Sequence, residues 1–393
     1  MYANSCNRYE IIAINSYVFI FPLLLNAELC SRKNHHLMNS LIVSFSRAGQ
    51  PLSTAVCEIP QLTEGQVLVA NEYTTLCRSD ISTYQGRRIE KSPTILGHEI
   101  VGRIVAFGPG QPARDAYGRP LHVGDRITWA IYAACPDGPM ARRGIPQKAA
   151  DLFKYGHEQL RPDNTLHGGL ATHTLLRRHT PILPLPDEVP LPAAAIINCA
   201  VSTVAGSLRL AGELKGRRVA LWGIGMLGTI ACAMCSEAGA AEIIALDVNP
   251  ERLAHARRFG ATATLRPDDP AAAAMQADVT IDYSGYGTAM EASVDALATG
   301  GTAVWVGGVC PQDRVRIDAE QLIRHLRTVR GLHNYNTDDF KTAVAFITTH
   351  GKKYPFADLV YDGFTLSEAE QAFAYAIDRN PYRVGIRIHH QNV

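Results

Sequence analysis

The sequence predicts an α/β protein with a doubly wound parallel sheet in one domain and a second domain upstream of it. Strand and helix patterns alternate over residues 216–334, as in consecutive βαβ units. A Gly-x-Gly-x-x-Gly pattern lies where the first strand of this stretch meets the first helix. The chain has 393 residues, about twice the usual length of one domain, so we expect two domains.

The strands of the parallel sheet are expected in short apolar or β-branched segments separated by helical patterns. Pro250 is a suitable first residue for one of the helices, and Gly260 is suitable for ending it. Crossover helices between successive strands place those strands in parallel. The expected strands are 217–222, 242–247, 263–266, 279–283, 302–308 and 328–333.

The glycine pattern predicts a dinucleotide-binding loop. Gly223 permits a tight turn, Gly225 lets a pyrophosphate approach the backbone, and Gly228 lets the helix pack on the strand. The helix begins near Met226 and Leu227, and its N-terminus would direct its partial positive charge at the phosphates. Glycines that only serve turns are the alternative.

An acidic residue at the end of the second strand supports the dinucleotide interpretation. Asp247 follows Gly223 by 24 residues and ends the segment Glu242–Asp247. A carboxylate there accepts hydrogen bonds from the adenosine ribose hydroxyls and repels a 2′-phosphate. The pattern therefore favours NAD over NADP.

Two cysteines and a histidine in separate segments upstream form a candidate metal site. They are Cys77 in Cys-Arg-Ser-Asp, His98 in Gly-His-Glu, and Cys199 in Asn-Cys-Ala-Val-Ser-Thr. Three such ligands leave the fourth position of a zinc ion open, as a catalytic zinc requires. From spacing alone, buried thiols and an ordinary core histidine remain an open alternative.

Composition excludes several function classes and indicates a compartment. Lys and Arg number 38 against 37 Asp and Glu, so nothing favours nucleic-acid binding or stable membrane association. Nine cysteines is an odd number for a disulfide framework. Reduced thiols are expected, and with them a cytoplasmic location. Cys232 and Cys235 lie on the apolar face of the helix after the glycine loop, and we expect buried core thiols there rather than a redox pair.

Residues 1–37 differ from the rest of the chain. The run Ile11–Leu25 is too short for a confident membrane span and has no convincing cleavage site after it. A more typical start follows at Met38. We expect a non-native or disordered extension from a misplaced start codon; a genuinely ordered segment and a targeting segment are the alternatives.

Taken together, the four motifs resemble those of the zinc-dependent medium-chain alcohol dehydrogenases, and the similarity runs from about residue 41 to 388. The Cys-Arg-Ser-Asp, Gly-His-Glu, Cys-x3-Thr and glycine segments occur in the family's order. The resemblance implies a β-rich GroES-like catalytic domain over residues 38–200, a Rossmann coenzyme domain over 201–334, and a return to the catalytic domain over 335–393.

The resemblance also implies a role for each motif residue. Cys77, His98 and Cys199 would bind one catalytic zinc, and Glu99 would be an outer or exchangeable ligand. Ser79 would hydrogen-bond the alcohol and pass its proton outward. The residues expected to contact NAD, in addition to the glycine loop and Asp247, are Arg78, Thr203, Arg252 and Arg383.

The sequence departs from the family where many relatives bind a second, structural zinc. The four-cysteine frame of that site reads Cys135, Gly138, Ala141 and Ala149 here. One thiol cannot hold a tetrahedral structural zinc, so we predict that this second zinc is absent. Ser82 stands where some relatives end their proton relay with a histidine, so proton exit would use water.

The substrate is expected to be a small alcohol or aldehyde. Position 199 is Cys rather than the acid of many polyol dehydrogenases, which mildly favours simpler alcohols. The segments 144–157 and 167–173 resemble a family branch associated with phosphonate catabolism. Arg87 and Arg88 would then select an anionic substrate, with Lys154 and His157 as further candidates; solvated surface charge is the alternative.

Two other functions are open for this fold, and the protein is expected to form an oligomer. A zinc-free quinone or enone reductase and a non-catalytic nucleotide-binding protein of the same fold are the alternatives to a dehydrogenase. Homodimers or homotetramers are expected from the resemblance, with the strand at 302–308 as a candidate edge for joining the sheets of two subunits.

Overall fold

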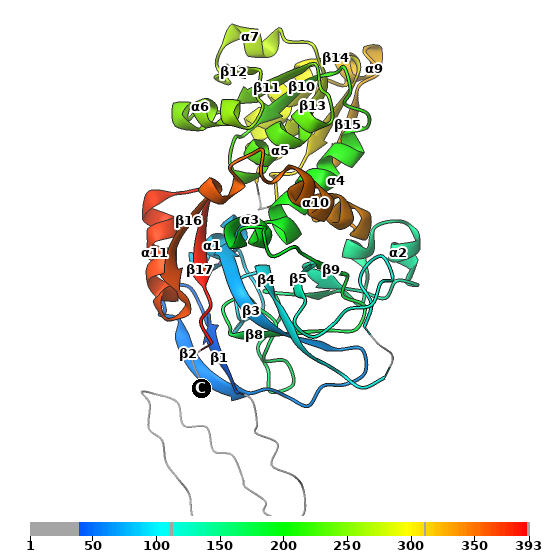
Figure 1. Cartoon of the computed structure of the whole chain (residues 1–393). Helices are drawn as coiled ribbons and strands as arrows, with labels where there is room; N and C mark the ends of the chain where they lie inside the picture. The colour runs from blue at the N-terminus through cyan, green and yellow to red at the C-terminus, as the bar shows by residue number, and fades with distance from the viewer. Residues whose placement is uncertain (1–38, 111–112, 310–311, 391–393) are drawn as a thin grey trace, which may run out of the picture. The chain divides into compact units, whose positions relative to one another are not determined.

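The computed structural model describes residues 39–110, 113–309 and 312–390 (Figure 1). The extension expected over residues 1–37 lies outside the described residues. Within them the chain forms an α/β fold with a mixed sheet built mainly from the first half of the chain and a parallel sheet from the second half. The predicted fold class is thereby confirmed.

The mixed sheet has seven strands. Its order is β16-β17-β3-β4-β5-β9, and β8 pairs with β3. The C-terminal strand β17 pairs with β3, and β16 pairs with β17, so the end of the chain returns to this first sheet. The strands are β3 (Val67–Leu76), β4 (Glu99–Phe107), β5 (Arg126–Trp129), β8 (His173–Leu176), β9 (Ile182–Pro184), β16 (Val360–Thr365) and β17 (Arg383–Arg387).

Short elements surround the mixed sheet. Two small antiparallel pairs are β1 (Asn39–Ser44) with β2 (Ser53–Glu58), and β6 (Tyr132–Ala133) with β7 (Phe153–Lys154). The helical segments are α1 (Arg78–Tyr84), α2 (Pro139–Arg142), η1 (Pro146–Lys148), η3 (Phe356–Leu359), η4 (Leu366–Glu368) and α11 (Ala369–Arg379).

The parallel sheet has six strands in the order β12-β11-β10-β13-β14-β15. Numbered along the chain, this order is 3-2-1-4-5-6, the arrangement of dinucleotide-binding folds. The strands are β10 (Arg218–Trp222), β11 (Glu242–Leu246), β12 (Ala263–Leu265), β13 (Ala277–Asp282), β14 (Leu297–Trp305) and β15 (Thr328–Gly331). Each of the six predicted strand segments overlaps one of them.

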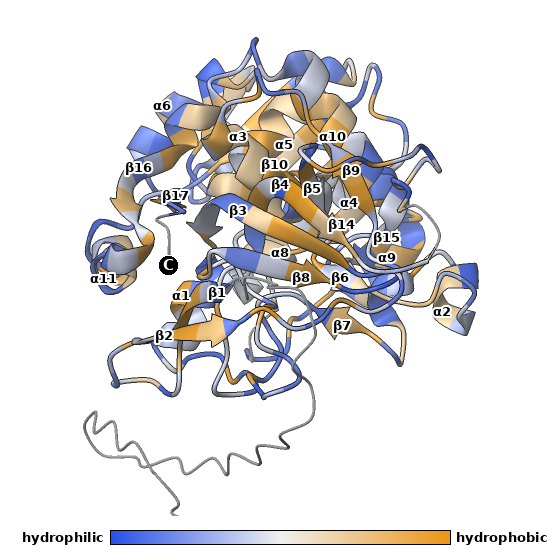
Figure 2. Ribbon diagram, turned by 60° about the horizontal axis from the view of Figure 1, so that its bottom comes forward, coloured by the Kyte–Doolittle hydropathy of each residue, from blue (hydrophilic) through white to orange (hydrophobic). Residues whose placement is uncertain are grey.

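Helices accompany the parallel strands along the chain. They are α4 (Ser202–Ala211), α5 (Met226–Glu237), α6 (Pro250–Arg258), α7 (Pro270–Ala273), α8 (Gly287–Asp295), α9 (Ala319–Arg324) and α10 (Thr337–His350). The central strand β10 is apolar from Val219 to Trp222 and is at most 1% exposed there, because it is covered on both faces. Figure 2 shows hydrophobic residues along the strands of both sheets.

One apolar stretch joins the two sheets. The helix α3 (Leu191–Ala195), the π-helical turn η2 (Ile197–Val201) and α4 follow one another directly. The span Leu191–Ala211 is long and apolar enough to cross a membrane, but 78% of its most apolar window is buried inside the protein. It is therefore a core segment of the fold.

The prediction that the 302–308 segment is an edge strand of the sheet is wrong. β14, which contains the first part of the 302–308 segment, pairs with β13 on one side and with β15 on the other. The outermost strand on this side of the described sheet is β15. The segment is apolar because it is an inner strand. In the sequence, such a strand cannot be told from an edge strand that a second subunit covers.

Candidate functional site

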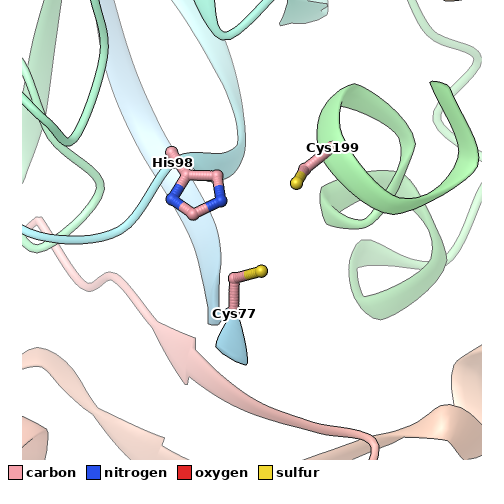
Figure 3. A group of neighbouring side chains, drawn as sticks. All are labelled: Cys77, His98 and Cys199. Carbon is pink, nitrogen blue, oxygen red and sulfur yellow. The ribbon is translucent and has the colours of Figure 1, made fainter. Parts of the chain in front are cut away.

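The three candidate metal ligands converge. One ligand atom from each of Cys77, His98 and Cys199 lies within 4.8 Å of the others, and Figure 3 shows both sulfur atoms and the imidazole ring directed towards a common point. Strand pairing explains two of them: Cys77 directly follows β3 and His98 directly precedes β4. These strands are antiparallel, with Thr75 opposite Glu99, so the two ligands meet at one end of the pair.

The third ligand comes from a π-helical turn. Cys199 lies in η2, between α3 and α4, and single π turns are frequent at functional sites. The neighbouring Asn198 fixes the turn, because its Nδ2 donates to the carbonyl oxygen of His98 at 3.0 Å. On the other side, the buried Tyr335 hydroxyl donates to the carbonyl oxygen of Asn198. The cysteine and histidine segments are thus linked directly.

Asp80 organises the other two ligand segments. Its Oδ2 accepts from the backbone N–H of Cys77 at 2.8 Å, and its Oδ1 accepts from the backbone N–H of Gly97 at 3.2 Å. The same Oδ1 lies 3.3 Å from His98 Nδ1, without an aligned hydrogen bond. A carboxylate behind a ligating imidazole orients the ring and leaves its other nitrogen for the metal.

Glu99 and Arg383 form a buried ion pair beside Cys77. Arg383 Nε and Nη2 donate to the two Glu99 carboxylate oxygens at 2.8 and 3.0 Å. The side chains are 0% and 2% exposed for Glu99 and Arg383. Arg383 Nη2 also lies 3.4 Å from the Cys77 sulfur. Arg383 begins β17, which pairs antiparallel with β3, so this contact follows from strand register.

Electrostatics favour a cysteine thiolate at this site. The contact with Cys199, together with the positive charge of Arg383, holds the pKa of Cys77 well below its usual range, although burial opposes this. The same contact and burial raise the pKa of Cys199. Burial disfavours a charged His98, but Asp80 and Cys77 outweigh burial and raise the pKa of His98 to about 10. Metal binding would therefore displace protons.

The donor set fits zinc. Two sulfurs and one imidazole nitrogen are a recognised catalytic zinc set, and a tetrahedral ion needs such atoms roughly 3.5–3.8 Å apart. The observed grouping within 4.8 Å requires only small side-chain adjustments to reach that geometry. Glu99 is held by Arg383 and by Thr75, whose hydroxyl donates to it at 2.5 Å. Glu99 therefore fixes the Arg383 guanidinium, which contacts the Cys77 sulfur.

The glycine loop has the geometry that its pattern predicts. Gly223 has a φ of +87°, and a Cβ there would lie 2.6 Å from the backbone nitrogen of Ser284. A Cβ on Gly228 would lie 2.2 Å from the carbonyl oxygen of Gly223, so the helix packs against the loop only with glycine. A Cβ on Gly225 would meet no protein atom within 4 Å. Gly225 caps α5, and its open side leaves room for a phosphate.

Asp247 is placed beside the glycine loop. Its Oδ2 accepts from the backbone N–H of Ile224 at 2.7 Å, and its Oδ1 accepts from that of Asn249 at 2.8 Å. The carboxylate thus fixes the loop and keeps acceptor capacity on each oxygen for a ribose hydroxyl. Arg252 lies nearby on α6, with its guanidinium carbon 5.7 Å from the centre of the Tyr382 ring.

The remaining predicted residues are distributed around these two centres. Arg78 is exposed, bonds Asn380, and has its pKa lowered by desolvation and by the charges of Arg252 and Arg383. Such a cluster of cations would be stabilised by phosphate oxygens. Ser79, beside Arg78 on α1, is half-buried. The other placements are Met226 and Leu227 in the first turn of α5, and Thr203, 8% exposed, on α4.

The two arginines expected to select an anion differ in their surroundings. Arg87 is exposed. Arg88 pairs with Glu90 at 2.6 Å, so its charge already has a partner. Arg383, expected to contact NAD, is almost fully buried against Glu99, and its coenzyme contact stays a prediction.

The segment 135–149, where many relatives have the four cysteines of a structural zinc site, is held by polar contacts. Asp151 Oδ2 accepts from the backbone N–H of Cys135 at 3.0 Å, and Asn336 Nδ2 donates to the carbonyl oxygen of Gly144 at 3.1 Å. The absence of a second zinc stays a prediction from the sequence. The thiols of Cys232 and Cys235 are both 0% exposed, as expected of core cysteines.

Comparisons with known proteins agree with this geometry. The family model for the alcohol dehydrogenase GroES-like domain matches residues 63–187, and that for the zinc-binding dehydrogenase domain matches residues 227–349. The chain belongs to the zinc-binding alcohol dehydrogenase family. This membership confirms the family resemblance found in the sequence, whereas the phosphonate branch stays a prediction.

Several family members can be aligned over most of their length. Probable D-xylulose reductase A proteins are 27% identical in Aspergillus clavatus and 28% identical in Neosartorya fischeri, each over 80% of this chain and 87% of the relative. An alcohol dehydrogenase structure from Thermotoga maritima matches with a TM-score of 0.83 at 24% identity, covering 90% of this chain and 100% of that one. A Sinorhizobium meliloti protein, described as a zinc-binding dehydrogenase and bound to NADP, matches with a TM-score of 0.77 at 22% identity, covering 89% and 99%.

Sequence reasoning missed the residues that support the ligands. Asp80 could have been suspected, because it stands three residues after Cys77 at the start of a helix, where an acid caps the backbone. Asn198 and Tyr335 gave no such signal, because their bonds join segments far apart in the chain. His157, which the sequence offers as a candidate contact for an anionic substrate, instead lies beside a ligand: its ring centre is 4.9 Å from that of His98.

Proposed function

We propose that this protein is a zinc-dependent oxidoreductase that transfers a hydride between a small alcohol, or the corresponding carbonyl compound, and NAD. The observation that carries the proposal is the convergence of Cys77, His98 and Cys199 in a chain that also holds a glycine loop with dinucleotide-binding geometry.

The protein's own residues would divide the work as follows. Cys77, His98 and Cys199 would hold zinc, which supplies Lewis acidity that polarises a bound oxygen and lowers the pKa of an alcohol. Asp80 holds the Cys77 and His98 segments in register. Ser79, half-buried at the start of α1, would accept the proton of the substrate hydroxyl and pass it towards solvent.

The coenzyme would lie against the parallel domain. The N–H groups at the start of α5 and the open face of Gly225 would receive the pyrophosphate. Arg78 and Arg252 would add charge to that interaction. Thr203 would contact the nicotinamide. Asp247 would bind the adenosine ribose, and its negative charge supports NAD as the preferred coenzyme over NADP.

Several finer features also belong to the proposal. Because some relatives are named D-xylulose reductase, polyols and ketoses should be included among the substrates tested. Cys199, which stands where many polyol dehydrogenases have an acid, instead favours simpler alcohols. A phosphonate-related alcohol or aldehyde stays a candidate. A cytoplasmic location and a homodimer or homotetramer are part of the same proposal.

The experiment is hydride transfer measured by NADH absorbance with a panel of alcohols, polyols and their carbonyl counterparts. We expect NAD-dependent turnover that is lost on zinc chelation and restored by zinc. Ser79→Ala should lower kcat by roughly 100-fold or more without changing zinc content. Turnover that survives complete zinc removal would favour a zinc-free reductase, and zinc-loaded protein that binds NAD without turnover would favour a non-catalytic role.

A further inference from the structure

Two lysines between β6 and β8 have no acidic partner within the described part of the chain. Among the ion pairs of the described residues, none involves Lys148 or Lys154, although 23 pairs link other residues. Lys148 Nζ instead donates to His333 Nδ1 at 2.6 Å. Lys148 ends η1, Lys154 ends the short strand β7, and His333 follows β15. We call these three residues the lysine cluster.

The Lys154 turn packs directly on a metal ligand. The backbone N–H of His157 donates to the carbonyl oxygen of Lys154 at 3.2 Å, which closes a turn over 154–157. A Cβ on Gly156 would lie 2.6 Å from the carbonyl oxygen of Gly97 and 3.0 Å from the Cβ of His98. With the close rings of His98 and His157, these contacts place the turn against the ligand histidine.

The other side of the turn reaches the Cys199 segment. Lys154 pairs with Tyr132 across the two-stranded sheet β6–β7. The Tyr132 ring lies 6.1 Å from that of Tyr335, whose hydroxyl accepts from the backbone N–H of Ile131 at 2.9 Å. That hydroxyl also bonds the carbonyl oxygen of Asn198, next to Cys199. Lys154 is therefore connected by contacts to both ligand segments.

The acids near the lysine cluster are committed to other groups. Glu90 pairs with Arg88 at 2.6 Å and with His157 at 3.0 Å. Glu158 pairs with the exposed Lys91 at 2.8 Å. Burial, the first cause, and the charges of Arg88 and Lys148 lower the pKa of Lys154, whereas the nearby Glu90 and Cys199 oppose this shift. The cluster thus gathers positive charge that no described acid neutralises by direct contact.

The histidine of the cluster is neutral and offers a donor. Burial and the charges of Lys154, Lys148 and Arg88 lower the pKa of His333 to about 4. Because the Lys148 ammonium donates to Nδ1, the proton of the neutral imidazole lies on Nε2. Two ammonium groups and one imidazole N–H then form a set made only of donors, which is suited to a group made only of acceptors.

We propose that the lysine cluster binds an anionic group of the substrate, carboxylate or phosphonate in type, and so selects hydroxy or carbonyl compounds that carry such a group over neutral ones. This inference rests on the proposed function, because it takes the reacting carbon to lie at the Cys77, His98 and Cys199 centre. It assigns selectivity to Lys148 and Lys154 rather than to Arg88, whose charge Glu90 already offsets.

Binding is the first test, because it does not depend on turnover. Methylphosphonate and acetate are titrated calorimetrically into protein that is loaded with zinc and saturated with NAD, which keeps the coenzyme phosphate site filled. We expect both Lys154→Met and Lys148→Met to weaken binding roughly tenfold or more. Lys352→Met is the matched control, because it removes an exposed lysine outside the cluster, and should leave binding unchanged. Stronger binding of one probe identifies the anion type.

Turnover provides the second test. The ratio of kcat/KM for 3-hydroxypropanoate or 3-hydroxypropylphosphonate to that for 1-propanol should exceed one in the natural protein and fall in both cluster variants. Turnover of 1-propanol with no anion preference would overturn this inference and leave the proposed function standing. Absence of probe binding, or equal binding in Lys154→Met, Lys148→Met and Lys352→Met proteins, would overturn it whatever the turnover.

Discussion

The Glu99–Arg383 pair should be strongly coupled energetically, because both side chains are buried and bonded by two short contacts. The perturbations are Arg383→Met, Glu99→Gln and the double variant. Removing one partner of a buried pair costs about 3–5 kcal/mol, because the other charge stays buried without compensation. The double variant leaves no buried charge in the pair and should cost less than the sum of the single changes.

The two single variants should differ. Burial raises the pKa of Glu99 even beside Arg383, so without the arginine this carboxyl can take up a proton and limit the cost to about 3 kcal/mol. Arg383 has no such escape, because a guanidinium does not lose its proton, and Glu99→Gln should cost about 5 kcal/mol. The coupling energy from the cycle should then be about 3 kcal/mol.

The pH dependence gives an independent check with a definite sign. In Arg383→Met the folded-state pKa of Glu99 lies above its ordinary value of 4.5. The folded state then binds more protons than the unfolded state, so the free energy of unfolding falls as pH rises from 4.5 through the raised pKa. The double variant lacks this carboxyl and should not show that loss.

The assay is denaturant unfolding of metal-free protein at several pH values, followed by circular dichroism, with zinc-saturated protein as a parallel series. Additive single effects, within about 0.5 kcal/mol, would refute the reasoning. So would a cost below about 1 kcal/mol for Arg383→Met, because it would mean that Glu99 is not held as a buried partner.

Three further changes test separate parts of the structure. Gly225→Ala should fold normally, since its Cβ meets no protein atom, but should weaken NAD binding measured by fluorescence titration. Gly228→Ala should lose stability, because its Cβ would lie 2.2 Å from a carbonyl oxygen. Equal stabilities of the two variants would contradict this. Asp247→Ala should lower the NAD-to-NADP ratio of kcat/KM roughly tenfold or more; an unchanged ratio would remove its role in coenzyme choice. Asn198→Ala should cost about 1–3 kcal/mol of stability and weaken zinc retention in a chelator competition, because the carbonyl of the histidine ligand loses its donor; retention equal to that of the natural protein would exclude this role.

The parallel domain could be predicted from the sequence because its signals are local. Each strand is a short apolar run, and the three glycines of the loop have separate steric requirements that the pattern expresses directly. The candidate ligands depended on the family resemblance, since Cys77 and Cys199 are far apart in the chain. Their meeting follows from strand register and from the π turn that carries Cys199.

Lys154 is a candidate anion contact in the sequence, but its grouping with Lys148 and His333 could not be predicted from any local pattern. Lys148 and His333 are 185 residues apart, and their contact requires the lobe after β6 to lie beside the end of β15. The sequence predicts Arg88 as an anion-selecting charge because it follows the Cys77 segment, but its pairing with Glu90 is seen only in the structure. The misplaced oligomer edge has the same origin, because an inner strand and a covered edge strand are equally apolar.

The central claim is that Cys77, His98 and Cys199 hold one zinc ion, and its most direct test is zinc per chain, measured by elemental analysis of protein purified without added metal. We expect about one zinc in the natural protein, far less in Cys199→Ser, and an unchanged amount in Cys135→Ser. Folded natural protein without zinc, or full zinc retention in Cys199→Ser, would contradict the account. Two zinc ions per chain would contradict the prediction that the second site is absent.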